Sequence, residues 1–126
     1  GMSFDEYFGI KDDMSDQEKY LSYAIGLAPR ATHIKYMDLS KVSLESKAGP
    51  SSSIACQVCS AMAATEALRI ILKPGGVKAV PHYFQFDPYT RKFRNGKLRM
   101  GNQNPIQKIK KLLIKALLKR KQSRHL

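Results

Sequence analysis

The chain has 126 residues, of which 43% are hydrophobic, and it carries a formal charge of +12 at pH 7. This length suits one domain, and the composition is typical of a globular protein, which excludes a disordered chain. No uncharged apolar run reaches eighteen residues, so we expect no membrane-spanning helix. The N-terminus lacks the features of a secretory signal, and two cysteines give no disulfide framework. These features favour a cytoplasmic protein.

The positive charge lies in the C-terminal half of the chain. Residues 1–47 carry six Lys or Arg against eight Asp or Glu, whereas residues 48–126 carry sixteen against two. Such asymmetry is typical of a contact with nucleic acid, an anionic membrane or an acidic protein. A solvated surface would have the same charge pattern.

Residues 1–50 form an acidic part that is predicted to be helical. Ser15 and Glu18 have the spacing of a capping box, in which each side chain satisfies a backbone donor of the other residue. This pattern predicts a helix over about residues 16–27. A shorter helical or irregular piece is expected over residues 31–37.

Residues 51–74 contain the only long segment that is apolar enough for a buried centre. From Ile54 onward no charge appears until Glu66. Because a helix that is apolar nearly all round belongs inside a fold, we predict a long central helix that the rest of the chain covers. Small side chains at helical spacing would let a neighbouring backbone approach it closely, at Ala55, Cys59, Ala63 and Ala67.

Residues 77–101 change to an alternating pattern, which predicts a small antiparallel β-meander. Asp87-Pro88-Tyr89-Thr90 has proline at the second position of a turn, and Asn95-Gly96 is a strong signal for a second, two-residue hairpin turn. The strands are expected over residues 77–80, 82–86, 91–93 and 97–100. Aromatic residues alternate here with Arg and Lys, which would suit base stacking and phosphate contacts, but a small sheet needs the same aromatic residues for its core.

Residues 104–126 are predicted to form a basic amphipathic helix. Asn104 is placed to cap it, and Pro105 suits the first helical position. An apolar stripe runs along it through Ile106, Ile109, Leu112, Leu113, Ala116 and Leu117. This helix is expected to be a solvated tail or a packing element, with an anionic membrane as an alternative contact. The residues that we expect to take part in interactions are Lys108, Lys111, Lys115 and Arg120.

Cys56 and Cys59 have the spacing of two thiolates that share one zinc ion. A structural zinc site needs four ligands, and the chain has no second pair of cysteines. We therefore favour a buried position for both thiols, with zinc ligation or redox chemistry as the alternatives. The chain has no glycine-rich phosphate loop and no local signature of a nucleophile with its base. By itself it is predicted to be non-catalytic and to bind no cofactor.

The central stretch resembles a late helix of the ThiF/MoeB/HesA adenylyltransferases, the E1-like enzymes that activate ubiquitin-like and sulfur-carrier proteins. Its Ala64-Thr65-Glu66-Ala67-Leu68-Arg69 segment is similar to the family's Ala-x-Glu-Ala-Ile/Leu-Lys/Arg pattern. VPHYFQFDPYTRKF resembles the strands that follow this helix in the family. MSFDEYFG and GNQNPIQ are similar to segments of a bacterial ThiF-like branch.

The resemblance implies that the chain is the C-terminal part of a larger protein, with an α+β fold or the fold of a C-terminal α/β fragment. The family's catalytic residues, with ATP and Mg²⁺, would belong to an upstream nucleotide-binding domain, so none is assigned here. The family's zinc cysteines lie outside this helix, so no zinc site is transferred. The implied role is packing on that domain, homodimer formation or docking of a ubiquitin-like carrier protein. The alternative is a stand-alone basic module for an anionic partner, either nucleic acid or a membrane surface.

Overall fold

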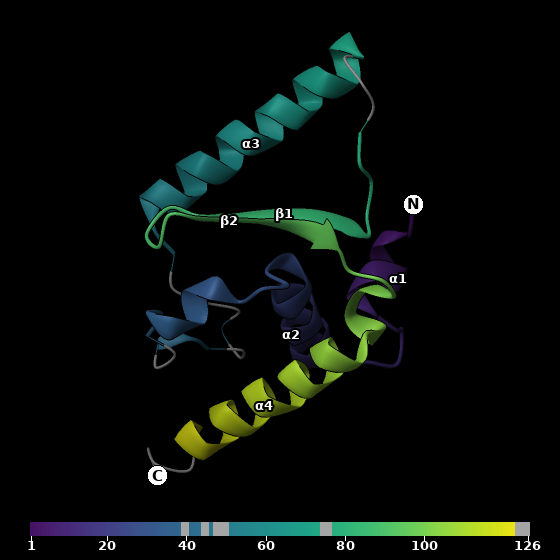
Figure 1. Cartoon of the computed structure of the whole chain (residues 1–126). Helices are drawn as coiled ribbons and strands as arrows, with labels where there is room; N and C mark the ends of the chain where they lie inside the picture. Colours follow the sequence, from purple (N-terminus) through teal and green to yellow (C-terminus); the bar gives the residue numbers. More distant parts are fainter. Residues whose placement is uncertain (39–40, 44–45, 47–50, 74–76, 123–126) are drawn as a thin grey trace.

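The structure, a computed structural model, describes residues 1–38, 41–43, 46, 51–73 and 77–122, with side chains of the last helix as far as residue 118. Within these residues it has four α-helices and a two-stranded antiparallel sheet, which confirms the predicted α+β class (Figure 1). The elements in chain order are α1 (Phe4–Phe8), α2 (Asp16–Leu27), η1 (Thr32–Lys35), α3 (Ser53–Leu72), β1 (His82–Asp87), β2 (Lys92–Lys97), η3 (Gly101–Gln103) and α4 (Pro105–Gln122).

Two helix starts lie where the capping signals predict them. The Ser15 hydroxyl accepts a hydrogen bond from the Glu18 backbone N–H at 3.3 Å, and α2 begins at the next residue. The Asn104 side-chain oxygen accepts from the Ile106 backbone N–H at 3.0 Å at the start of α4. Both caps satisfy backbone donors that lack partners within the first helical turn.

The core lies where α1, α2 and η3 meet, below the hairpin in Figure 1. Its buried hydrophobic side chains are Tyr7, Phe8, Leu21 and Ile25. The Asn102 side-chain amide of η3 donates to the backbone oxygens of Phe8 at 2.9 Å and Ser22 at 2.7 Å. These two hydrogen bonds connect η3 to α1 and α2, and α4 begins directly after η3.

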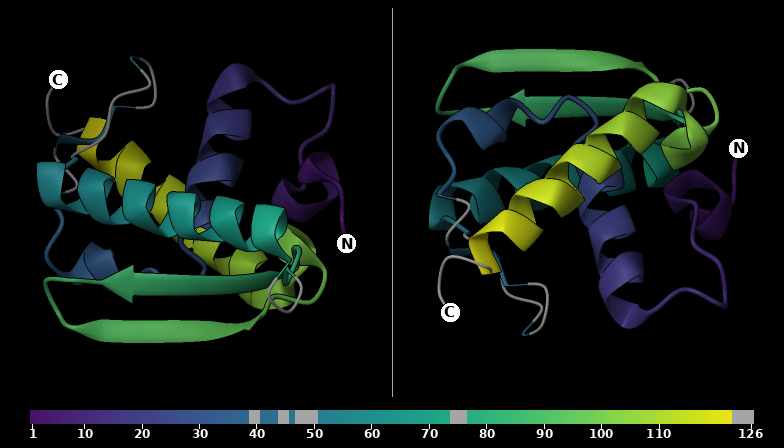
Figure 2. Two further views of the ribbon diagram at one scale, coloured as in Figure 1. Left: turned by 90° about the horizontal axis from the view of Figure 1, so that it is seen from above. Right: turned by 90° about the horizontal axis from the view of Figure 1, so that it is seen from below.

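The predicted long helix forms as α3, but its predicted buried position is wrong. None of its residues is buried. The views in Figures 1 and 2 agree that α3 and α4 lie on opposite sides of the molecule, and Figure 2 shows the hairpin to one side of both helices. The aromatic side chains of α1 and α2 pack on one another instead of covering α3.

The first predicted turn of the β-meander, at Asp87-Pro88-Tyr89-Thr90, is confirmed, whereas the second predicted turn and the number of strands are wrong. In the register of the hairpin Phe84 pairs with Asn95 and Asp87 pairs with Lys92, so the chain reverses over residues 88–91 and Asn95-Gly96 lies inside β2. The buried Asp87 side chain accepts a hydrogen bond from the Thr90 backbone N–H at 3.0 Å. This side-chain bond stabilises the turn that follows β1. Residues 77–80 and 98–100 form no strand.

Candidate interaction surfaces

The α3 surface comprises the small residues predicted for interaction and the large apolar residues near them. Ala55, Cys59, Ala63 and Ala67 are all exposed. Large side chains with more than half of their area exposed are Ile54, Leu68, Ile70, Ile71 and Leu72. Exposed large apolar side chains on neighbouring turns are a feature typical of surfaces that contact another molecule.

The two cysteines belong to this exposed helix, so the prediction that they lie in the core is wrong. Cys56 and Cys59 are both free and exposed. Among the described residues, no group of three or more His, Cys, Asp or Glu side chains is arranged to hold a metal ion. The structure therefore brings no further ligand to the predicted zinc pair within the described part of the chain.

By length and composition alone α3 could cross a membrane, which the sequence analysis did not expect. None of its most apolar window is buried. Core helices of soluble proteins meet the same criterion, so this property by itself does not assign α3 to a bilayer.

A groove that the sequence did not predict lies between α3 and the hairpin. It has a volume of about 850 Å³, and α3 contributes Met62, Glu66 and Arg69 to its wall. On the facing side of the sheet the rings of Phe84 and Phe93 stack with their centroids 6.4 Å apart. Spacing along the chain could not reveal this groove, because its two walls come from segments that the chain joins through a loop.

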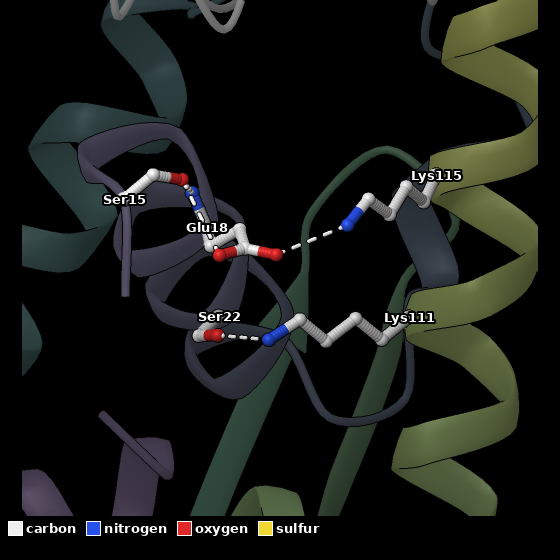
Figure 3. A network of polar contacts seen from close by, with 5 residues as sticks. All are labelled: Ser15, Glu18, Ser22, Lys111 and Lys115. Atoms are coloured by element: carbon white, nitrogen blue, oxygen red, sulfur yellow. Dashed lines mark hydrogen bonds and ion pairs between the residues drawn. The ribbon is translucent and has the colours of Figure 1, made fainter. Parts of the chain in front are cut away.

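The inner face of α4 packs against α2 and combines polar side chains with the half-buried Ile114 and Leu118. Gln107 is buried, Lys110 donates to the backbone oxygen of Pro29, and Lys111 donates to the Ser22 hydroxyl at 2.5 Å. The Lys111 and Ser22 side chains extend toward each other from facing helices (Figure 3). Partial burial lowers the pKa of Lys111 because the charged form loses hydration.

Lys115 forms the second polar link between α4 and α2. Its ammonium group lies 3.1 Å from a carboxylate oxygen of Glu18, whose side chain also accepts from the Ser15 hydroxyl at 3.3 Å (Figure 3). The hydrogen bond and the charge of Lys115, with the Ser15 contacts, lower the pKa of Glu18. Lys111 and Lys115, both predicted to act in interactions, thus hold α4 in place.

The outer face of α4 carries the predicted apolar stripe, and this stripe faces solvent. We define the outer face by five side chains that are 49–69% exposed: Ile106, Ile109, Leu112, Leu113 and Leu117. Lys108 is also exposed, and the Arg120 side chain lies outside the described residues. The sequence pattern located the stripe correctly, but α4 does not use it to pack on this chain.

A buried carboxylate supports the hairpin turn rather than an open site. Asp87 is only 4% exposed. Desolvation alone would raise its pKa, but hydrogen bonds from the Thr90 backbone and from the Thr32 and Tyr36 side chains lower the pKa overall. Burial lowers the pKa of the nearby His33. These groups stabilise the contact between η1 and the end of β1.

Comparison with known proteins gave no relative. No family model matches the chain, and neither a curated protein nor a solved structure does. The α+β fold and the two exposed helix surfaces are therefore the observations on which its function has to be argued.

Proposed function

We propose that this chain is the non-catalytic C-terminal region of an E1-like adenylating protein, and that α3 packs on the nucleotide-binding domain of that protein. The observation that carries the proposal is the exposure of α3. This helix has a proper cap, with the Ser52 hydroxyl accepting from the Ala55 backbone N–H at 3.2 Å, and it runs for 20 residues without burying one. A helix with this apolar composition is normally covered, so a further domain is its natural partner.

The resemblance of residues 64–69 to the ThiF/MoeB/HesA helix supports the same assignment. In this proposal ATP and Mg²⁺ bind to the covering domain in the cytoplasm, and the chain described here contributes packing rather than catalytic groups. The strip of small residues on α3 allows close approach of that domain's backbone. Dimer formation and docking of a ubiquitin-like carrier protein are further roles open to the same surface.

The mass of the native polypeptide is the first test. An antibody raised against this chain would be used to probe an extract of the source cells. We expect a band at least about 15 kDa heavier than the 14.2 kDa of this chain, since a nucleotide-binding domain has at least that size. A band near 14.2 kDa would overturn the proposal.

Activity of the longer protein provides the second test. We expect it to catalyse ATP–pyrophosphate exchange with its carrier protein, and we expect Ala63→Arg to reduce that exchange by inserting a long cation into the packing surface. Ala61→Arg is the matched control, because Ala61 is equally exposed but lies on roughly the opposite side of α3. If both variants lose ATP–pyrophosphate exchange, the nucleotide-binding domain packs around both sides of α3. Full exchange in both would contradict the proposed packing.

A further inference from the structure

Polar contacts join α4 to α2, and five large aliphatic side chains of α4 point outward. Lys110, Lys111 and Lys115 are bound to groups on or just after α2, and Gln107 is almost fully buried beside them. An amphipathic helix normally packs with its apolar stripe inward. Here the inward stripe combines Gln107, Lys110 and Lys111 with the half-buried Ile114 and Leu118, while the five large aliphatic side chains of the outer face stay exposed.

The C-terminal part of the sequence, to which the outer face belongs, is rich in positive charge. Residues 88–126 contain thirteen Lys or Arg and no Asp or Glu. At helical spacing Lys108 lies along the edge of the outer face, and its side chain is exposed. A partner of this surface must therefore accept a row of Ile and Leu side chains and also supply negative charge beside it.

We propose that the outer face of α4 binds the surface of an anionic phospholipid bilayer. The helix lies parallel to the membrane, the five aliphatic side chains of the outer face enter the boundary of the acyl region, and Lys108 meets the headgroup phosphates. Helices with one apolar face and one cationic flank bind membranes in this way. A nucleic acid would satisfy the charge but offers no apolar layer for the five aliphatic side chains.

The position of α3 is compatible with this contact. Because α3 and α4 lie on opposite sides of the molecule, a domain that covers α3 leaves the outer face of α4 free to reach a membrane (Figures 1 and 2). The inference goes beyond the proposed adenylation role and does not depend on it. The vesicle experiment below uses no ATP, so its failure would leave that role standing.

Vesicle flotation with the full chain tests the inference. The probes are vesicles of phosphatidylcholine alone and vesicles that also contain phosphatidylserine. We expect binding to the anionic vesicles only, and we expect Lys108→Gln to weaken it about fivefold, the contribution of one cation near an anionic surface. Raising the salt concentration should weaken it further, since screening reduces attraction to charged headgroups.

Paired glutamine variants identify the helix that binds. Ile109→Gln with Leu113→Gln removes two side chains of the outer face and should weaken binding at least about tenfold. The matched control is Leu68→Gln with Ile71→Gln, which makes the same exchanges at exposed positions of α3 and should leave binding unchanged. Far-UV circular dichroism checks that both variants keep their helices, and the altered side chains are exposed in each case.

Three results would overturn the inference. Equal binding to neutral and anionic vesicles would remove the role of the cationic flank. Loss of binding in the α3 variant alone would assign the membrane contact to α3. The third result is that the unchanged chain binds no vesicles and forms an oligomer that the variant with Ile109→Gln and Leu113→Gln does not form. This would show that a second copy of the chain covers the outer face.

Discussion

The close approach of η3 to α1 makes Gly101 the most sensitive position of the core. Gly101 is buried with a φ of 51°, and a Cβ atom built on it would lie 2.2 Å from the carbonyl oxygen of Tyr7 and 2.8 Å from the Tyr7 Cα atom. We predict that Gly101→Ala destabilises the chain. Both the left-handed backbone and the Tyr7 backbone exclude a methyl group there.

The expected loss follows from these two causes. A left-handed conformation costs an alanine about 1–2 kcal/mol, and overfilling a packed site costs about 1–3 kcal/mol. The lower entropy of the unfolded chain opposes them by only about 0.4–1 kcal/mol. We therefore expect the free energy of unfolding to fall by about 3 kcal/mol, a large part of the roughly 5–15 kcal/mol that holds a typical domain together.

Urea unfolding followed by far-UV circular dichroism measures this loss. Gly96→Ala is the control, because Gly96 has no left-handed φ and the nearest atoms to a Cβ there belong to a side chain, that of Tyr83, with the hydroxyl oxygen at 3.1 Å. We expect the control to change stability by less than about 1 kcal/mol. If Gly101→Ala were within about 0.5 kcal/mol of the control, η3 would not approach α1 as closely as described.

Three further predictions concern α2, α3 and α4. The pKa of Glu18 is lowered in the folded chain, so its carboxylate stabilises the fold above the ordinary pKa of 4.5. This stabilisation is lost as the pH falls through the folded-state pKa. Glu18→Gln should therefore lower the urea midpoint near neutral pH but not in strong acid. Ser22→Ala removes the acceptor of the half-buried Lys111 ammonium and should lower the free energy of unfolding in urea by about 1–3 kcal/mol. Adding Lys111→Met to the same chain should restore part of this loss, because the unpaired cation is then removed. Both α3 cysteines should react with a thiol reagent without denaturant as fast as an unstructured cysteine peptide does, whereas strong protection would restore the buried-helix prediction.

Local signals in the sequence were sufficient to predict the helix starts. The Ser15 cap and the Asn104-Pro105 pair act through hydrogen bonds and backbone angles within a few residues, so no knowledge of the rest of the fold was needed. The hairpin turn is also local. Asp87-Pro88-Tyr89-Thr90 predicted the turn that forms at residues 88–91, where the buried Asp87 side chain binds the Thr90 backbone. The turn predicted at Asn95-Gly96 does not form, because both residues pair with β1.

The exposure of a helix face cannot be predicted from its own pattern. The apolar composition of α3 predicted burial, and the stripe on α4 predicted a face suited to docking, yet both surfaces are exposed. Which face a helix buries depends on partners that are distant in the sequence, such as Ser22 and Pro29 for α4. The sequence therefore placed the small and apolar residues on helices that form, while the surroundings of those helices required the structure.

The two exposed helices differ in charge, and this difference favours a different kind of partner for each. Covering the five large aliphatic side chains of α3 would contribute on the order of 10 kcal/mol, comparable to the whole stability of a small domain. The charged residues of α3 are Glu66 and Arg69, which pair at 3.2 Å, so a dry protein interface over α3 would bury no net charge. The outer face of α4 has Lys108 at its edge and no acidic residue in its helix, so a dry interface there would desolvate a cation at high cost. At a bilayer surface the same cation remains hydrated among phosphates while the aliphatic side chains leave water, which is why we assign α3 to a protein and α4 to a membrane.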